Sequence, residues 1–134
     1  MKAEARKMSG ASESPRRILV VEDDEDMREN LRRILTLAGY QVHLARDGSE
    51  AITVLQTEPF HLVLTDLVMP RMGGLELLRE IRRRERDLPV VFLTAFGKPA
   101  AFAEAMDLGA VGFVTKPFQA NSLLEAIREV FDGP

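Results

Sequence analysis

Short apolar runs alternate with longer segments of helical spacing along residues 16–132. The short runs are rich in β-branched residues, as expected of strands covered on both faces, and they lie at 18–21, 41–45, 62–64, 90–93 and 111–114. The segments after them carry apolar residues at three- and four-residue steps, which predicts helices at 27–38, 49–57, 74–84, 99–108 and 119–131. Gly39 and Gly109 follow two of these segments, where helices commonly end. The pattern is a strand followed by a helix, five times over.

This alternation predicts an α/β fold. Strands that alternate with helices form a parallel sheet with right-handed crossover connections and helices on both faces. The expected architecture is therefore a (βα)5 doubly wound, five-stranded parallel sheet in a three-layer sandwich. In such sheets ligands bind beyond the carboxyl ends of the strands, where the strand order reverses. The residues that follow each apolar run are thus the first candidates for binding or catalytic residues.

Length and composition fit that fold. A chain of 134 residues can bury one core, and we expect one domain at 16–132 behind a disordered leader at 1–15 that has no periodic pattern. The chain has no cysteine, which excludes disulfides and thiolate chemistry. No apolar run is long enough to cross a bilayer and no signal-peptide core follows the N-terminal basic residues, so we expect a cytoplasmic protein without membrane contact.

The net charge of the chain and the distribution of its arginines limit the partners that it is expected to bind. The formal net charge of −3 disfavours direct nucleic-acid binding by the whole surface. Five arginines lie in the second half of the third predicted helix or just after it, at positions 79, 82, 83, 84 and 86. Cations near a helix C-terminus suit the helix dipole, and we interpret this cluster as a solvated helix end.

Polar residues that could take part in binding or catalysis follow four of the five predicted strands. They are Glu22, Asp23 and Asp24 after the first, Asp66 after the third, Thr94 after the fourth, and Lys116 with Pro117 after the fifth. Each alone has an ordinary explanation, because Asp and Thr often cap helices and a single lysine is usually solvated. Together, several carboxylates near Asp66 would repel one another unless a cation were present. Mg²⁺ is a hard cation that accepts carboxylate oxygens and leaves a position for a phosphoryl oxygen, so the group indicates a phosphoryl-transfer site.

Four motifs in order resemble the receiver domain of two-component response regulators, in the superfamily of the chemotaxis regulator. They are Ile-Leu-Val-Val-Glu-Asp-Asp at 18–24, Leu-Val-Leu-Thr-Asp-Leu-Val-Met-Pro at 62–70, Val-Val-Phe-Leu-Thr-Ala at 90–95 and Gly-Phe-Val-Thr-Lys-Pro-Phe at 112–118. The resemblance covers nearly all of 16–132 and implies the flavodoxin-like strand order 2-1-3-4-5. It also implies a phosphoacceptor that takes a phosphoryl group from the phosphohistidine of a histidine kinase, switches a surface and self-dephosphorylates.

By this resemblance Asp66 is the phosphorylated residue. Glu22 and Asp23 would form the acidic pair that holds Mg²⁺, with Asp23 binding more directly and Glu22 through water. Asp66 and the backbone carbonyl of Val68 would complete the protein ligands. Asp24 lies one place beyond the pair.

The resemblance assigns charge handling and switching to further residues. Lys116 would pair with Asp66 before transfer and with the phosphoryl group afterwards, and its bond to Pro117 is cis in many such domains. Thr94 would bond a phosphoryl oxygen, and the ring of Phe113 would swing inward to fill the space that Thr94 leaves. The fourth helix, fifth strand and fifth helix would form the surface that changes.

Two positions resemble those that tune the lifetime of the phosphoryl group in the family. Val68 lies two residues after the acceptor, and Phe96 lies two residues after the threonine. Neither side chain can orient a water through a hydrogen bond, and both could shield the phosphoryl group. We therefore hypothesise slow self-dephosphorylation.

Three other functions use part of the same set of residues. A haloacid-dehalogenase-like phosphatase also has a strand-end Asp and Mg²⁺, but it needs a second acid where this chain has Val68. A flavodoxin-like cofactor binder needs a phosphate loop rich in Ser, Thr and Gly after the first strand, where this chain has acids at 22–26. A pseudo-receiver that only binds partner proteins is the third alternative, and the full set of acids, Thr94 and Lys116 disfavours it.

The resemblance also implies partners. The exposed face of the first helix, including Met27, Arg28 and Leu31, would dock on the helical hairpin of a histidine kinase or phosphotransfer protein. A homodimer through the fourth helix, fifth strand and fifth helix is compatible with the family. We expect a signalling switch rather than an ordinary enzyme, either as a single-domain regulator or with an output domain outside this chain.

Overall fold

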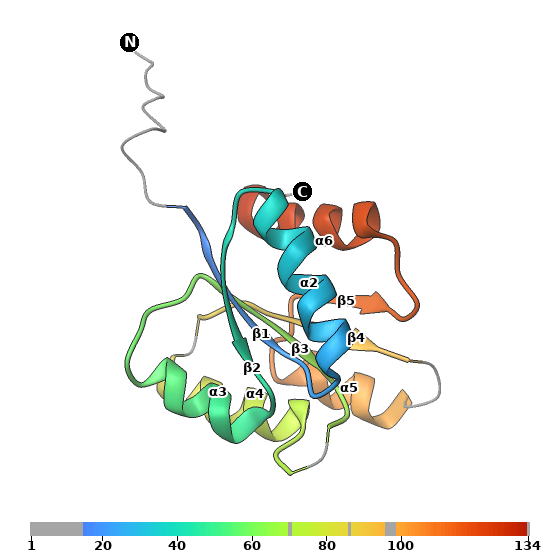
Figure 1. The fold of residues 1–134 in the computed structure, drawn as a ribbon. Coiled ribbons are helices and arrows are strands. Elements are labelled where there is room, and N and C mark those ends of the chain that lie inside the picture. The colour runs from blue at the N-terminus through green and yellow to red at the C-terminus, as the bar shows by residue number, and fades with distance from the viewer. Residues whose placement is uncertain (1–14, 70, 86, 96–98, 134) are drawn as a thin grey trace.

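Strands and helices alternate along the described residues in the expected order (Figure 1). The computed structural model describes residues 15–69, 71–85, 87–95 and 99–133, so almost all of the expected leader at 1–15 lies outside them. The elements are β1 (Arg17–Val21), α2 (Glu25–Leu37), β2 (Gln41–Ala45), α3 (Gly48–Leu55), β3 (Leu62–Asp66), α4 (Gly74–Arg84), β4 (Val90–Thr94), α5 (Pro99–Asp107), β5 (Gly112–Thr115) and α6 (Ala120–Asp132). None of these helices has the length and apolar character needed to cross a bilayer.

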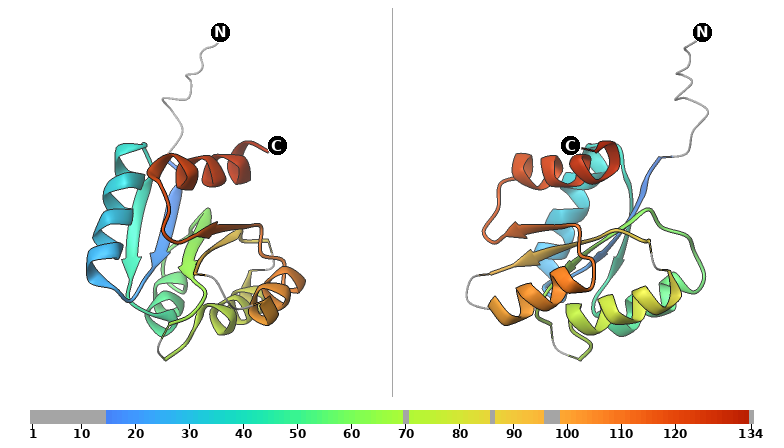
Figure 2. Two further views of the ribbon diagram at one scale, coloured as in Figure 1. Left: turned by 90° about the vertical axis from the view of Figure 1, so that its right-hand side faces the viewer. Right: turned by 180° about the vertical axis from the view of Figure 1, so that it is seen from behind.

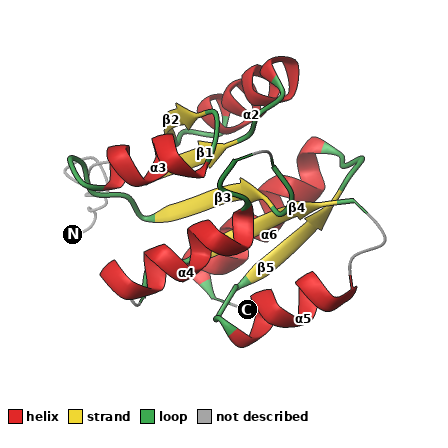
Figure 3. Cartoon of the chain, turned by 90° about the horizontal axis from the view of Figure 1, so that it is seen from below, coloured by secondary structure: helices red, strands yellow, loops and turns green. Residues whose placement is uncertain are grey.

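The five strands form one parallel sheet in the order β2-β1-β3-β4-β5, which confirms the doubly wound α/β fold. Helices α2 and α6 cover one face, and α3, α4 and α5 cover the other (Figure 2). Seen from below, α3, α4 and α5 lie side by side under the sheet (Figure 3). The periodic apolar residues of each helix therefore form the two cores of a three-layer sandwich.

Each core joins one face of the sheet to its helices. Residues on alternate strand positions point to opposite faces, so neighbouring residues of one strand belong to different cores. On the face of α2 and α6 the core includes Ile18, Val20, Leu31, Leu35, Leu62, Leu64, Leu123 and Ile127. On the opposite face it includes Leu19, Val63, Ala51, Leu77, Leu78, Ile81, Phe92 and Ala105.

The strands differ from the sequence prediction in their burial and in where they end. All five residues of β3 are buried, whereas only Ala45 of β2 and Val114 of β5 are buried, so the two edge strands are less completely covered than the sequence pattern predicts. In addition, β3 and β4 run on to Asp66 and Thr94, which are the last strand residues rather than the first loop residues.

Gly74 lets α4 begin against the end of β3. A Cβ atom on Gly74 would lie 2.3 Å from the backbone oxygen of Asp66 and 2.9 Å from the Cα atom of Leu67. It would also lie 2.8 Å from a ring carbon of Phe92. The backbone N–H of Gly74 donates to the carbonyl of Leu67 at 3.0 Å. The absence of a side chain at this position is therefore needed to hold the end of β3 in place.

We predict that Gly74→Ala lowers the free energy of unfolding by about 2 kcal/mol or more, because the new methyl group meets backbone atoms that cannot rotate away. Gly112→Ala is the matched control, since its Cβ would lie at an ordinary 3.6 Å from a Val91 methyl group. Denaturant unfolding of both variants checks the prediction. Equal losses of stability in the two variants would contradict it.

Candidate functional site

The parallel register brings the ends of four strands to one edge of the sheet. Asp66 ends β3 and Thr94 ends β4, while Glu22 directly follows β1 and Lys116 directly follows β5. The hydrogen-bond ladder continues past β5, because the backbone N–H of Lys116 donates to the carbonyl of Thr94 at 2.8 Å. All four residues lie at the carboxyl edge of the sheet, where the sequence pattern predicts a site.

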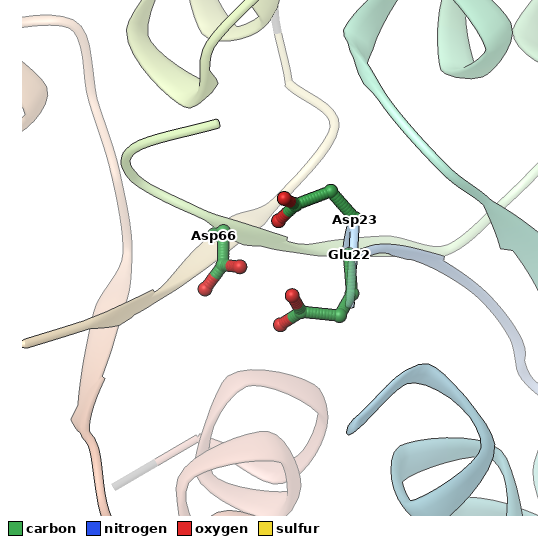
Figure 4. Close-up of side chains that lie close together, drawn as sticks. All are labelled: Glu22, Asp23 and Asp66. Carbon is green, nitrogen blue, oxygen red and sulfur yellow. The ribbon is translucent and has the colours of Figure 1, made fainter. Parts of the chain in front are cut away.

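Three carboxylates lie close together at this edge. Glu22, Asp23 and Asp66 each offer an oxygen within 4.8 Å of the others. Figure 4 shows the carboxyl groups of Glu22 and Asp23 pointing toward Asp66. Glu22 and Asp66 are 1% and 5% exposed, whereas Asp23 is open to solvent. Hard oxygen donors on a partly open site suit a divalent cation that keeps some of its waters, so these residues fit Mg²⁺.

Lys116 is the cation that this protein itself supplies to the cluster. Its Nζ lies 2.6 Å from Oδ1 of Asp66 and 3.2 Å from Oε1 of Glu22. Burial disfavours the charged lysine, but the hydrogen bonds and charges of Asp66 and Glu22 outweigh burial and raise its pKa. Lys116 is therefore held protonated between the two acids. The peptide bond from Lys116 to Pro117 is cis.

The pKa of Asp66 is raised to about 7, and burial is the largest cause of this shift. A hydrogen bond with the carboxyl group of Glu22 and the charge of that group contribute to the rise, while Lys116 opposes it. Burial and the neighbouring acid therefore favour the protonated form of Asp66, and Lys116 offsets only part of that effect.

The acidic run after β1 divides between the site and the next helix. The side chain of Asp24 accepts a hydrogen bond from the backbone N–H of Met27 at 2.8 Å and caps α2. The backbone N–H of Asp24 donates to Oε2 of Glu22 at 3.0 Å, which orients that carboxylate. Glu25 and Asp26 lie in the first helical turn, where acids suit the helix dipole. Only Glu22 and Asp23 therefore face Asp66.

A cleft of about 260 Å³ opens beside the acids. It is lined by Asp66, Leu67, Val68, Leu93, Thr94, Ala95 and Lys116. The Thr94 hydroxyl donates to the carbonyl of Ala95 at 2.9 Å, and Val68 is 63% exposed. The metal-ligand role of the Val68 carbonyl stays a prediction, and Phe96 lies outside the described residues.

Phe113 lies in a row of three aromatic rings. Its ring centroid is 5.8 Å from that of Phe92 in the sheet and 4.3 Å from that of Phe102 on α5. Phe113 is half-buried, and Phe102 is 45% exposed. The predicted switch residue therefore connects the inner strand β4 to the surface of α5. Its movement stays a prediction.

The predicted docking face on α2 needs a correction. Leu31 is fully buried in the core beneath α2, so the expectation that it is exposed for a partner is wrong. Its helical position, four residues before buried Leu35, points it at the sheet. Met27 and Arg28 are half-buried at the first turns of the same helix, and the guanidinium of Arg28 contacts the backbone of the acidic turn.

The arginine cluster on α4 is also more ordered than a solvated helix end. Arg82 donates to the carbonyls of Leu88, Leu108 and Gly109 at 2.7–3.0 Å, which ties α4 to the ends of two loops. Arg79 pairs with Glu104 on α5, while Arg83 and Arg84 pair with Glu80; Arg86 lies outside the described residues. The expectation of free solvation is thus wrong for Arg82, whose donors are used within the fold.

A 2-1-3-4-5 parallel sheet with a buried strand-end aspartate, an acidic pair and a lysine defines the class of receiver domains in signalling. The chain belongs to the response regulator receiver domain family, whose model matches residues 18–128. Receiver domains of this family act as switches in two-component signalling, and phosphorylation and Mg²⁺ binding are typical of them.

Relatives and solved structures agree with this family. The chain is 42% identical over 114 residues to the response regulator MprA of Mycolicibacterium vanbaalenii, covering 85% of this chain and 49% of that protein. It therefore spans about half the length of the curated relatives that it matches. The non-phosphorylated HemR receiver domain of Leptospira biflexa is similar with a TM-score of 0.82 and 36% identity, over 90% of this chain and 97% of that one. The chemotaxis response regulator CheY4 of Vibrio cholerae has a TM-score of 0.81 and 31% identity, over 87% and 99%.

We predict that Asp66→Asn stabilises the metal-free protein in a pH-dependent way. Because the pKa of Asp66 is raised from 3.8 to about 7, the folded wild type holds a proton that the unfolded chain releases, and wild-type stability falls as pH rises through this window. Asn removes that loss, so the stability advantage of the variant over wild type should grow by about 2 kcal/mol between pH 5 and pH 8.

Thermal unfolding in a chelator across this pH range measures the difference. Asp24→Asn is the matched control, because it removes an exposed acid from the turn that carries Glu22 and Asp23, and Asn also caps helices. A stability difference that is equal at both pH values, or equal in the two variants, would contradict the expected role of Asp66 burial.

Proposed function

We propose that Asp66 accepts a phosphoryl group from the phosphohistidine of a histidine kinase or phosphotransfer protein. The contact of Lys116 Nζ with Oδ1 of Asp66 at 2.6 Å, beside the acidic pair, carries this proposal. A buried carboxylate that faces both a fixed cation and two further acids is suited to receive a group of high negative charge. A partner-binding module without phosphorylation would not need this arrangement, which requires charges to be held in a buried place.

The side chains at the site divide the work of transfer. The Asp66 carboxylate attacks phosphorus, a new O–P bond forms, and the P–N bond to the donor histidine breaks with its electron pair leaving on the imidazole. Glu22, Asp23, Asp66 and the Val68 carbonyl would hold Mg²⁺, which when bound neutralises charge on the phosphoryl oxygens. Lys116 already lies against Asp66 and would follow the charge onto the transferred group.

Thr94 and Phe113 would carry the signal away from the site. The Thr94 hydroxyl now donates to the Ala95 carbonyl, and a phosphoryl oxygen on Asp66 would offer it a charged acceptor in the same cleft. Movement of Thr94 would open space beside Phe113, whose ring contacts Phe102 on α5. The surface of α5, β5 and α6 would then change, and it is the surface we assign to an output domain or to a homodimer partner.

The proposed setting is a cytoplasmic two-component pathway. Met27, at the start of α2 next to the acids, would contribute to docking of the phosphodonor protein. Hydrolysis of the acyl phosphate by water would later reset the domain. Because the curated relatives are about twice as long as the matched region, an output domain outside this chain is part of the proposal.

We predict that the protein incorporates one phosphoryl group from acetyl phosphate in the presence of Mg²⁺ and none in a chelator. Asp66→Asn should abolish labelling because it removes the nucleophile, and Lys116→Met should slow it because the developing charge loses its partner. Asp24→Asn should be labelled like wild type, since Asp24 caps a helix. Intact-protein mass spectrometry measures the product, and labelling of Asp66→Asn would refute Asp66 as the acceptor.

Val68→Asn should shorten the lifetime of the phosphorylated state several-fold. An amide at this exposed position beside Asp66 can orient an attacking water, whereas the valine can only shield the phosphoryl group. Val68→Leu is the matched control and should leave the decay rate near that of wild type. Decay of the acyl phosphate after removal of the donor gives the rates; Phe96→Glu offers a second variant. Unchanged or slower decay in both Val68→Asn and Phe96→Glu would count against the shielding role.

A further inference from the structure

Arg28 lies near the start of α2, and its side chain turns back toward the acidic site. Its Nη1 donates to the backbone carbonyl of Glu22 at 2.9 Å and, with a longer contact, to that of Asp23 at 3.4 Å. These are the two residues whose carboxyl groups point toward Asp66 (Figure 4). One guanidinium group therefore contacts the backbone of both members of the acidic pair.

These contacts connect two fixed points of the chain. At the start of the pair, the backbone N–H of Glu22 donates to the carbonyl of Ala45 at 3.0 Å and extends the sheet. After the pair, Asp24 caps α2, and the backbone N–H of Arg28 donates to the Asp24 carbonyl at 2.9 Å. The arginine side chain holds the turn between these points from the side of the helix. Because a carboxylate is placed only as well as the backbone that carries it, this turn decides where the oxygens of the acidic pair lie.

Charge alone would give Arg28 the opposite effect on a metal ion. A guanidinium group near the acids repels Mg²⁺, so its removal would tighten Mg²⁺ binding if long-range charge were the dominant influence. If Arg28 acts by positioning the turn, its removal instead lets the carboxylates move and weakens binding. The sign of the change in Mg²⁺ affinity therefore separates the two effects.

We infer that Arg28 is a positioning residue for the phosphoryl-transfer site, which holds the turn between β1 and α2 so that Glu22 and Asp23 face Asp66. The inference rests on the proposed function, because it concerns the metal and phosphoryl chemistry of the same site. It gives Arg28 a role inside the domain, different from the docking role that the resemblance implies for this residue.

Arg28→Met tests the inference, because methionine keeps a long side chain and a similar helix propensity but removes every donor. Isothermal titration of the full chain with MgCl₂ should show binding about tenfold weaker than in wild type, as for other residues that orient metal ligands. Arg28→Lys keeps one cationic donor and should recover part of the affinity. Arg33→Met is the matched control: it removes an exposed arginine from the same helix and should bind Mg²⁺ like wild type.

Phosphorylation by acetyl phosphate distinguishes a positioning role of Arg28 from a docking role, because this small donor transfers its phosphoryl group without a partner protein. The rate of phosphorylation of Arg28→Met by acetyl phosphate should fall at limiting Mg²⁺ and recover toward the wild-type rate at high Mg²⁺. A docking residue would leave this rate and the Mg²⁺ affinity unchanged and slow only the transfer from a phosphohistidine protein. Melting curves in a chelator confirm that the compared variants are folded at the assay temperature.

Two outcomes would overturn the inference: Mg²⁺ binding by Arg28→Met that equals or exceeds that of wild type, or equal weakening in Arg28→Met and Arg33→Met. If wild type itself bound no Mg²⁺ and took no phosphate from acetyl phosphate, the proposed function would fail instead. The two failures are thus distinguished by the wild-type protein alone.

Discussion

Repulsion among carboxylates at one edge of the sheet is the constraint on which the rest of the structure depends. Two nearly buried acids, Glu22 and Asp66, lie beside the exposed Asp23, and negative charges at such distances repel one another. Lys116 balances part of this charge, while burial and the neighbouring Glu22 raise the pKa of Asp66. The folded domain therefore keeps a deficit of positive charge at one place. A site with that deficit favours the binding of cations, and of anionic groups that bind together with a cation.

Most of the fold can be predicted from the sequence, because each element follows its own periodicity. The runs that become β1, β3 and β4 are continuous and apolar, as buried parallel strands require, and the helices repeat at three and four residues. The pattern is less informative at the margins. It does not show that β2 and β5 are edge strands, because their position depends on strand order, which only the family resemblance supplied.

The candidate site divides in a similar way. Asp66, Thr94 and Lys116 can be located from the sequence because each stands at a strand end, and parallel strands place their ends together. The role of Arg28 could not be found in this manner, since the direction of a long side chain is decided by the folded turn rather than by spacing. Burial of Leu31 was within reach, because its four-residue spacing from Leu35 already places both on one helical face. The close approach of Gly74 to Asp66 depends on atomic distances, which spacing in the sequence does not give.

The shared register of the strands links the chemistry of this domain to the accuracy of its folding. A slip of β1 by one residue against β3 would move its side chains by about 3.3 Å and turn them to the other face of the sheet. Glu22 would then leave the edge where Asp66 and Lys116 meet, even if the apolar residues still found a core. A misregistered chain could remain compact and yet be chemically silent. The accuracy of the strand register therefore decides whether the acids and Lys116 meet at one place.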